Sequence, residues 1–402
     1  MERRNLEYAD SKSSKFWNIE LEGTSHTVVY GRIGTDGQTK TKDFGSAEKA
    51  KTSFDKLVAQ KLGKGYVDAV DPAAAASDGG ALSSIHFPCC VKEDDLYENI
   101  RTFAGKRVVD YKAAKPPGAG VDAVFRFRGD WEDQNFDADL DHFLASDHAA
   151  RATAIVIGCW SPEDMYDTPA ETIIGKLAGS SGKLPNLAAI YLGDITRDEC
   201  EMSWIKQSDL SPLLAAFPEL QLLRTRGMEG LELEKPVHQR LRALAIETGG
   251  MPVQVVRAVC QSDFPELEYL ELWLGTDHYG GDSTVEDLQP ILSGKLFPKL
   301  KYLGLRNCDH ADAIAGVIVN APILERIETL DLSLGTLSDE GGRALLNLPT
   351  DGSLQRVNLH HHFMNADMAK KLAALDLIVD VSNPQEQEDD DGDAWRFVAV
   401  GE

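Results

Sequence analysis

The chain has 402 residues, of which 43% are hydrophobic and 26% charged, so it can bury a large core in two or three domains. Its net charge of −24 argues against binding of the whole surface to nucleic acid or to an anionic membrane. The charge is uneven: residues 1–70 hold 12 basic and 10 acidic residues, a net of +2, and the remaining residues hold 29 and 55, a net of −26. The sequence therefore predicts two modules of opposite electrostatic character.

Several targeting and binding classes are not expected. No run approaches the roughly 18 apolar residues of a membrane helix, and the start of the sequence does not resemble a signal peptide, which predicts a cytoplasmic protein without membrane contact. Six cysteines are too few for a disulfide scaffold, and none forms a Cys-x-x-Cys pair. We expect no cofactor and no metal.

Residues 1–68 predict a small antiparallel sheet. Apolar and polar residues alternate over 16–21, and a β-branched run follows at 27–33. Asp36-Gly37 is a pair that adopts the positive φ of a tight hairpin, so 38–44 is expected to return antiparallel to the run before it.

One helix is expected to cover this sheet. Ser46 is a favourable N-cap, Leu62 lies near the expected end, and Gly63 offers a C-terminal cap. The apolar residues between them fall at helical spacing, at Ala47, Ala50, Phe54, Leu57 and Val58. Lysines occupy much of the remaining helix surface and make this module basic.

This part of the chain resembles the WGR domain, which occurs in poly(ADP-ribose) polymerases and in bacterial proteins such as the molybdate metabolism regulator. The resemblance runs through Lys15-Phe16-Trp17-Asn18-Ile19-Glu20-Leu21, Val29-Tyr30-Gly31-Arg32-Ile33-Gly34-Thr35-Asp36-Gly37-Gln38, Phe44 and the helix, and it ends at Lys61, Gly65 and Tyr66. Tyr30 replaces the tryptophan of the family signature. Nothing after residue 68 resembles the catalytic domain of the polymerases, so no transferase activity is implied.

The resemblance implies a nucleic-acid-binding role for Tyr30 and Arg32. Tyr30 could stack on a sugar, with less area than tryptophan, and Arg32 could bind a phosphate with two hydrogen bonds. Lys40 and Lys42 complete the candidate nucleic-acid-binding set. The alternative is equally compatible with the sequence: the signature residues shape a strand end and form a salt bridge.

Residues 69–84, rich in alanine and glycine, predict a flexible linker. Beyond it, the pattern L-x-x-L-x-L recurs, with first positions at 187, 220, 241, 267, 300, 327 and 354. Helical patterns alternate with these repeats at 211–217, 285–293, 311–319, 339–346 and 365–375. Residues 151–382 are therefore expected to form an α/β leucine-rich-repeat solenoid, or horseshoe, and the full chain a multi-domain protein with a small α+β WGR domain in front.

Residues 85–150 are expected to form the N-terminal cap of the solenoid, because its first repeat would otherwise expose its leucines. His360-His361-His362 invites a metal hypothesis. Neighbouring residues on a strand point to opposite sides, however, so the three rings are not expected to converge on one ion.

The concave face of such a sheet predicts a protein-binding surface. Its outward positions lie between the leucines, and the candidates are Tyr191, Arg224, Arg226, Glu271, Trp273, Arg306, Asp331, Asn358 and His360. Trp273 is the strongest of them because its position in the repeat predicts exposure. The alternative is that a one-residue irregularity turns it inward.

Residues 383–402 predict an acidic tail that ends in a strand-like segment. Residues 383–394 contain six carboxylates and no basic residue, whereas Trp395 and Phe397 begin an apolar stretch that could add to a sheet edge or seal the last repeat. The region from about residue 85 resembles bacterial leucine-rich-repeat proteins with an acidic tail.

The sequence favours a non-enzymatic scaffold that binds a protein partner through the concave face. One alternative is a nucleic-acid-binding regulator that acts through the WGR domain. The other is a carrier or substrate protein whose last segment is recognised by a partner enzyme.

Overall fold

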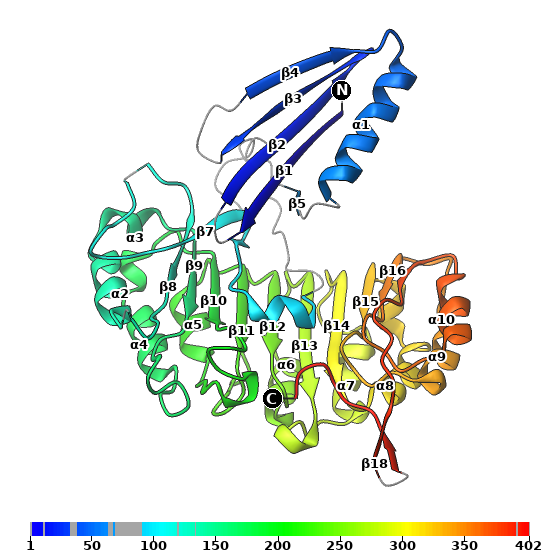
Figure 1. Cartoon of the computed structure of the whole chain (residues 1–402). Helices are drawn as coiled ribbons and strands as arrows, with labels where there is room; N and C mark the ends of the chain where they lie inside the picture. Colours follow the sequence, from blue (N-terminus) through cyan, green and yellow to red (C-terminus); the bar gives the residue numbers. More distant parts are fainter. Residues whose placement is uncertain are drawn as a thin grey trace. The chain divides into compact units, whose positions relative to one another are not determined.

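The structure is a computed structural model that describes residues 2–10, 13–32, 38–62, 67–68, 91–118, 120–132, 134–390 and 393–401. The chain divides into two compact units, Met1–Ser84 and Ile85–Glu402 (Figure 1). The predicted linker at 69–84 lies outside the described residues. None of the described helices is both long and apolar enough to cross a membrane.

The first unit is a five-stranded antiparallel sheet with one helix on one face. The strand order is β4-β3-β2-β1-β5. The elements are β1 (Glu2–Asp10), β2 (Ser13–Glu22), β3 (Ser25–Arg32), β4 (Gln38–Asp43), α1 (Ala47–Leu62) and β5 (Val67–Asp68). The predicted strands and helix are confirmed, but β1 was not predicted, because Leu6 is the one buried apolar side chain described in its largely polar sequence.

Helix α1 begins where the sequence predicts. The Ser46 hydroxyl accepts a hydrogen bond from the Lys49 backbone N–H at 3.4 Å, as expected of an N-cap. Its apolar stripe packs Phe54 and Val58 against Trp17 and Ile19 of β2 and the neighbouring strands. Helix α1 does not cover the part of this sheet face that lies at the edge strand β4.

The second unit is built on a twelve-stranded sheet, mostly parallel, in the order β17-β16-β15-β14-β13-β12-β11-β10-β9-β8-β7-β6. Only β6 and β7, among these strands, pair antiparallel. The strands are β6 (Thr102–Phe103), β7 (Lys106–Asp110), β8 (Val124–Phe127), β9 (Ala154–Gly158), β10 (Ala189–Asp194), β11 (Leu222–Arg226), β12 (Ala243–Glu247), β13 (Tyr269–Gly275), β14 (Tyr302–Cys308), β15 (Thr329–Asp331), β16 (Arg356–Asn358) and β17 (Ile378–Asp380).

Short helices connect the strands and lie together on one side of this sheet (Figure 1). They are α2 (Phe136–Leu144), α3 (Asp147–Arg151), α4 (Glu171–Gly179), α5 (Ser211–Ala216), α6 (Val253–Cys260), α7 (Val285–Leu292), α8 (Ala311–Ile318), α9 (Asp339–Leu345) and α10 (Ala366–Ala373). Single 3₁₀ turns are η1 (Glu93–Tyr97), η2 (Ser181–Lys183), η3 (Met202–Trp204), η4 (Asp277–Tyr279) and η5 (Pro322–Glu325). The five predicted helices match α5, α7, α8, α9 and α10 within two residues at either end.

The recurring leucines form ladders across neighbouring strands. Leu223, Leu244, Leu270 and Leu303 are register partners in β11 to β14, and each is 0% exposed. Parallel strands in register place equivalent residues side by side, so each repeat buries its leucines against the next. Each predicted first position of a repeat lies two residues before the start of a strand, so the rest of each L-x-x-L-x-L pattern enters that strand.

The sheet face opposite the helices is covered by two other segments of the same unit. Residues 91–101, with η1, cross one part of this face, and residues 396–401 cross another (Figure 1). We call them the strap and the tail segment. Of the predicted cap, residues 102–127 supply β6, β7 and β8 of the sheet itself. The acidic stretch forms a hairpin of β18 (Glu388–Asp390) and β19 (Asp393–Trp395), and the tail segment crosses the sheet face instead of pairing with a sheet edge.

Candidate functional site

A groove of about 570 Å³ lies in the first unit between α1 and the uncovered end of the sheet face. Its floor is apolar, with Trp17, Val28 and Leu57, and Tyr30 lies at its side. The register explains this set, because Tyr30 pairs with Trp17 and Val28 pairs with Lys40. Residues that face each other in adjacent antiparallel strands project to the same side of the sheet.

Three lysines line this groove: Lys40, Lys42 and Lys61. Lys40 Nζ lies 5.6 Å from the centre of the Tyr30 ring, and Lys61 Nζ lies 5.4 Å from that of Trp17. Such cation–π contacts hold ammonium groups over aromatic faces. His26 adds no positive charge near pH 7, because burial lowers its pKa.

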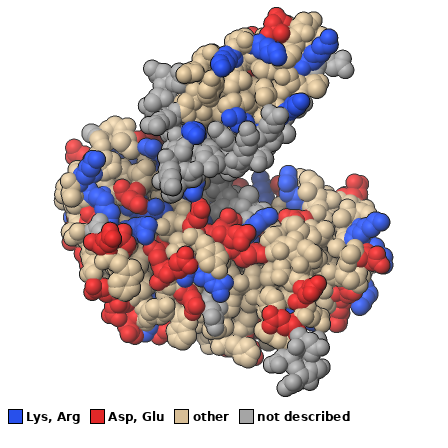
Figure 2. Space-filling view, viewed as in Figure 1, with Lys and Arg blue, Asp and Glu red and all other residues tan. Residues whose placement is uncertain are grey.

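The structure brings together three of the four predicted nucleic-acid-binding residues. Tyr30, Lys40 and Lys42 share the groove, and the Tyr30 hydroxyl donates to Gln38 Oε1 at 3.1 Å. Arg32 ends β3, where its backbone pairs with Lys15, but its side chain lies outside the described part of the chain. The visible surface of the first unit carries mainly Lys and Arg among its charged side chains, whereas Asp and Glu are abundant on the larger unit (Figure 2).

The predicted exposure of the sheet face of the larger unit is wrong. Each candidate is at most 8% exposed: Tyr191, Arg224, Arg226, Glu271, Trp273, Arg306, Asp331, Asn358 and His360. Trp273, predicted to be the main exposed anchor, is 0% exposed and packs with Leu96 of the strap and Val400 of the tail segment. These nine residues therefore bind the chain's own segments and one another.

Paired charges make this burial possible. Glu247 accepts from Arg224 Nε at 2.5 Å and from Arg226 Nε at 2.8 Å. Burial alone would raise the pKa of Glu247, but the two guanidinium groups hold it below its usual value. A buried carboxylate without such partners would cost several kcal/mol.

A second network lies beside the first. Glu271 accepts from Arg306 Nη1 and Trp273 Nε1, each at 2.6 Å, and Arg306 also donates to the Val91 carbonyl of the strap. Asp331 accepts from Asn358 Nδ2 at 2.8 Å. These bonds connect β13 with β14, β14 with the strap, and β15 with β16.

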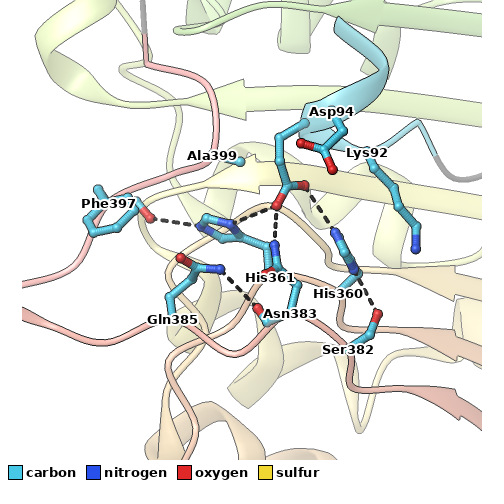
Figure 3. Close-up of a pocket in the computed structure, with 10 residues that line it drawn as sticks. Lys92, Asp94, His360, His361, Ser382, Asn383, Gln385, Phe397 and Ala399 are labelled. Atoms are coloured by element: carbon cyan, nitrogen blue, oxygen red, sulfur yellow. Dashed lines mark hydrogen bonds and ion pairs between the residues drawn. The ribbon is translucent and has the colours of Figure 1, made fainter.

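A pocket of about 620 Å³ lies where the strap, the end of the sheet and the tail segment meet (Figure 3). Glu93 of η1 lies at the centre of this pocket. Its Oε2 atom lies 3.0 Å from His360 Nε2. Its Oε1 atom lies 3.7 Å from His361 Nδ1 and accepts a hydrogen bond from Asn383 Nδ2. We call these four residues the Glu93 clasp. Burial raises the pKa of Glu93, but the nearby His361 ring and hydrogen bonds from its own backbone and from His360 outweigh this and lower the pKa to about 2.

Ser382 Oγ lies 2.8 Å from His360 Nδ1, so Ser382, His360 and Glu93 form a hydrogen-bonded line. Acyl-transfer enzymes use these three residue types, but there the hydroxyl lies against Nε2 and the carboxylate against Nδ1. In this pocket the two nitrogens are exchanged, and Glu93 also binds His361 and Asn383. We therefore interpret the cluster as a clasp that ties the strap to the end of the sheet.

One group of metal-donor residues with suitable spacing occurs in the described residues: Cys308, Asp309 and His310. Burial raises the pKa of the Cys308 thiol far above neutrality, so it remains protonated and is a poor ligand. The ring of His310 lies 2.9 Å from the Asp309 carboxylate instead. His362, predicted not to share an ion with its neighbours, lies 3.0 Å from the Val381 carbonyl.

Three residues that hold the two segments were not predicted from the sequence, namely Glu93, Asn307 and Ser203. Their signals are weak, because a single carboxylate, amide or hydroxyl is common anywhere in a sequence. Asn307 has a positive φ of 50°, which asparagine tolerates better than most residues. Of the two predicted tail residues, Trp395 is 49% exposed and Phe397 packs edge-on against Phe363 with ring centres 5.2 Å apart.

Residues 2–73 match the WGR domain family. This part is 42% identical over 64 residues to the uncharacterized protein YfeS of Escherichia coli (strain K12), covering 16% of this chain and 26% of that protein. It is 40% identical over 65 residues to Protein YehF of the same organism, covering 16% and 24%. The chain thus spans about a quarter of the length of these curated relatives.

Nearly the whole chain is similar to a protein from Bacteroides fragilis whose crystal structure is known. The sequences are 30% identical, the TM-score is 0.67, and the match covers 96% of this chain and 97% of that chain.

Proposed function

The chain belongs to the same family as the Bacteroides fragilis protein and carries a WGR domain at residues 2–73, and from this premise we propose that it is a two-unit binding protein without a catalytic role. WGR domains are typically involved in nucleic-acid or protein interaction. The first unit is proposed to bind a nucleic-acid strand in the lysine-lined groove. The larger unit is proposed to be a leucine-rich-repeat scaffold for a protein partner.

The lysine-lined groove is the observation that carries the nucleic-acid proposal. Lys40, Lys42 and Lys61 surround an apolar floor, and Tyr30 offers an aromatic side chain beside it. Ammonium groups neutralise phosphates, and aromatic rings stack with bases or sugars whatever the sequence. A single strand fits this chemistry better than a duplex, because its bases are free to stack.

The test is a fluorescence titration of the full chain with single-stranded and duplex DNA over a salt series. If three phosphates are neutralised, log K should fall with log salt with a slope of about −2, from about −0.7 per phosphate on a single strand. Replacing Lys40 and Lys42 together by Ala should weaken binding and reduce this slope by about 1.4.

The matched control replaces Lys49 and Lys56, two exposed lysines of α1 outside the groove, by Ala. It removes the same charge from the same unit and should change the slope far less. Equal losses in the two double variants would show that overall charge, and not the groove, determines binding. No binding at low salt would remove the nucleic-acid proposal.

The scaffold proposal for the larger unit is supported by its repeated strand and helix units with in-register leucines. Repeat sheets of this kind offer long surfaces suited to extended partners. The face expected to bind a partner is occupied by the strap and the tail segment, so a partner there must compete with the chain itself.

A further inference from the structure

The tail segment is held mainly through its backbone, as a bound peptide would be. Ala399 N donates to the Leu334 carbonyl at 2.9 Å, and the Gly401 carbonyl accepts from Ser203 Oγ at 2.7 Å. The residues that hold it come from β14, the loop after β15, and η3. The segment therefore lies across several repeats and does not extend the sheet at an edge.

Asn307 makes the most specific of these contacts. Its Nδ2 donates to the Val400 carbonyl at 2.6 Å, and its Oδ1 accepts from Val400 N at 3.0 Å. One side-chain amide thus bonds both backbone groups of a single residue, as a neighbouring strand would. Asn307 is 0% exposed with the tail segment in place, so both hydrogen bonds to Val400 are shielded from water.

Three side chains of the tail segment also contact the surface, in addition to its backbone. Arg396 Nη1 bonds Asp312 at 2.7 Å and the Thr336 carbonyl at 2.6 Å. Phe397 packs against Phe363 and His361, and Val400, 1% exposed, joins Trp273 and Leu334. The surface thus contacts a basic residue, an aromatic residue and a buried aliphatic residue at positions one, two and five of the segment that begins at Arg396.

Glycine is required where the end of the tail segment crosses the sheet loops. A Cβ on Gly249 would lie 2.5 Å from the Gly401 carbonyl oxygen and 2.0 Å from Ser203 Oγ. The loop at Gly249 therefore approaches the bound backbone as closely as a residue without a side chain allows.

We propose that this surface, defined by Ser203, Gly249, Asn307, Asp312 and Phe363, is a peptide-binding groove whose intramolecular ligand is the tail segment. Its partner is a protein with an extended segment of the same pattern, which displaces the tail segment. The inference deepens the proposed scaffold function and rests on it. Tethering gives the tail segment an effective concentration of the order of mM, so it competes strongly with any partner.

The first experiment uses the chain shortened after Ala394 and a fluorescein-labelled peptide of residues 394–402. The shortened chain should bind the peptide, and the intact chain should bind it about 100-fold more weakly because its own tail segment competes. Asp312→Ala in the shortened chain should weaken binding about tenfold, and Gly249→Ala should weaken it more, whereas Asp367→Ala, on α10 outside the groove, should not. A peptide with the same residues in scrambled order should not bind.

A shortened chain that melts cooperatively but does not bind the peptide would overturn the inference. If the shortened chain does not fold, a protease site inserted between Asp391 and Gly392 of the intact chain allows cleavage after folding. Exchange of the cleaved segment for labelled peptide would then support a binding groove. Retention of the cleaved segment against excess peptide for days would show a structural seal and overturn the inference.

The same samples show which molecule occupies the groove, and they test this inference independently of the nucleic-acid proposal. A concentration-dependent dimer of the intact chain, lost on shortening, would identify a second copy as the occupant and overturn the partner-protein assignment. DNA binding by the shortened chain should equal that of the intact chain. If the shortened chain binds DNA but not the peptide, this inference is refuted and the nucleic-acid proposal stands. If it binds the peptide but not DNA, the nucleic-acid proposal is refuted and this inference stands.

Discussion

Replacing Glu93 by Gln should loosen the strap, because the clasp depends on the charge of this carboxylate. The variant keeps the shape of the side chain and removes the charge that faces His360 and His361. A pKa of about 2 instead of 4.5 corresponds to about 3 kcal/mol, at about 1.4 kcal/mol per pKa unit. Since 25% of the side chain is exposed, solvent screening reduces the expected loss at pH 7 to about 2 kcal/mol.

The pH dependence follows from the direction of this shift. The pKa of Glu93 is lower in the folded chain than in the unfolded chain, so the unfolded chain binds the proton more readily. The stabilisation is therefore complete above about pH 4.5 and is lost as the pH falls towards 2. The difference between wild type and Glu93→Gln should shrink over this same window.

The assay combines urea unfolding with hydrogen exchange at pH 7, 5.5, 4 and 3. The strap can open without global unfolding, so exchange of the Arg197 amide, which donates to the Leu96 carbonyl at 2.9 Å, reports it directly. Glu98→Gln is the control, since Glu98 is exposed and pairs with Arg101 on the same segment. A loss below about 0.5 kcal/mol, or one that stays constant from pH 7 to 3, would show that the charge of Glu93 does not hold the strap.

Two further predictions concern the sheet. Glu271→Ala should destabilise the larger unit by about 3–5 kcal/mol in urea unfolding, because Arg306 and Trp273 Nε1 lose a buried acceptor. A loss below about 1 kcal/mol would show that this hydrogen-bond network is not essential for stability. Gly193→Ala should cost at least about 2 kcal/mol, because φ is 102° and the new Cβ would lie 2.4 Å from the Arg226 carbonyl oxygen. Gly175→Ala should instead raise stability by about 0.5–1 kcal/mol, because Gly175 lies inside α4 and its new Cβ would have no neighbouring atom within 4 Å. Equal melting temperatures for the Gly193→Ala and Gly175→Ala variants would contradict this contrast.

The groove of the first unit could be predicted in part. Tyr30 was named from the resemblance to the WGR domain, Lys40 and Lys42 belonged to the same candidate set, and the antiparallel register places all three on one face. Lys61 and Leu57 join them only because α1 packs at a particular position on the sheet. That position depends on how Phe54 and Val58 fit the strands, which local spacing does not specify.

The local elements and the consecutive order of the strands in the large sheet could be predicted from the amino-acid sequence. Ser46 and the apolar stripe determine α1, and the recurring leucines determine parallel strands in register, because helix capping and side-chain periodicity act between residues close in the chain. The burial of the opposite sheet face, in contrast, depends on contacts that form only in the folded chain. Trp273 is buried by Leu96 and Val400, more than 100 residues away in either direction, and such long-range packing leaves no periodic trace in the sequence around Trp273.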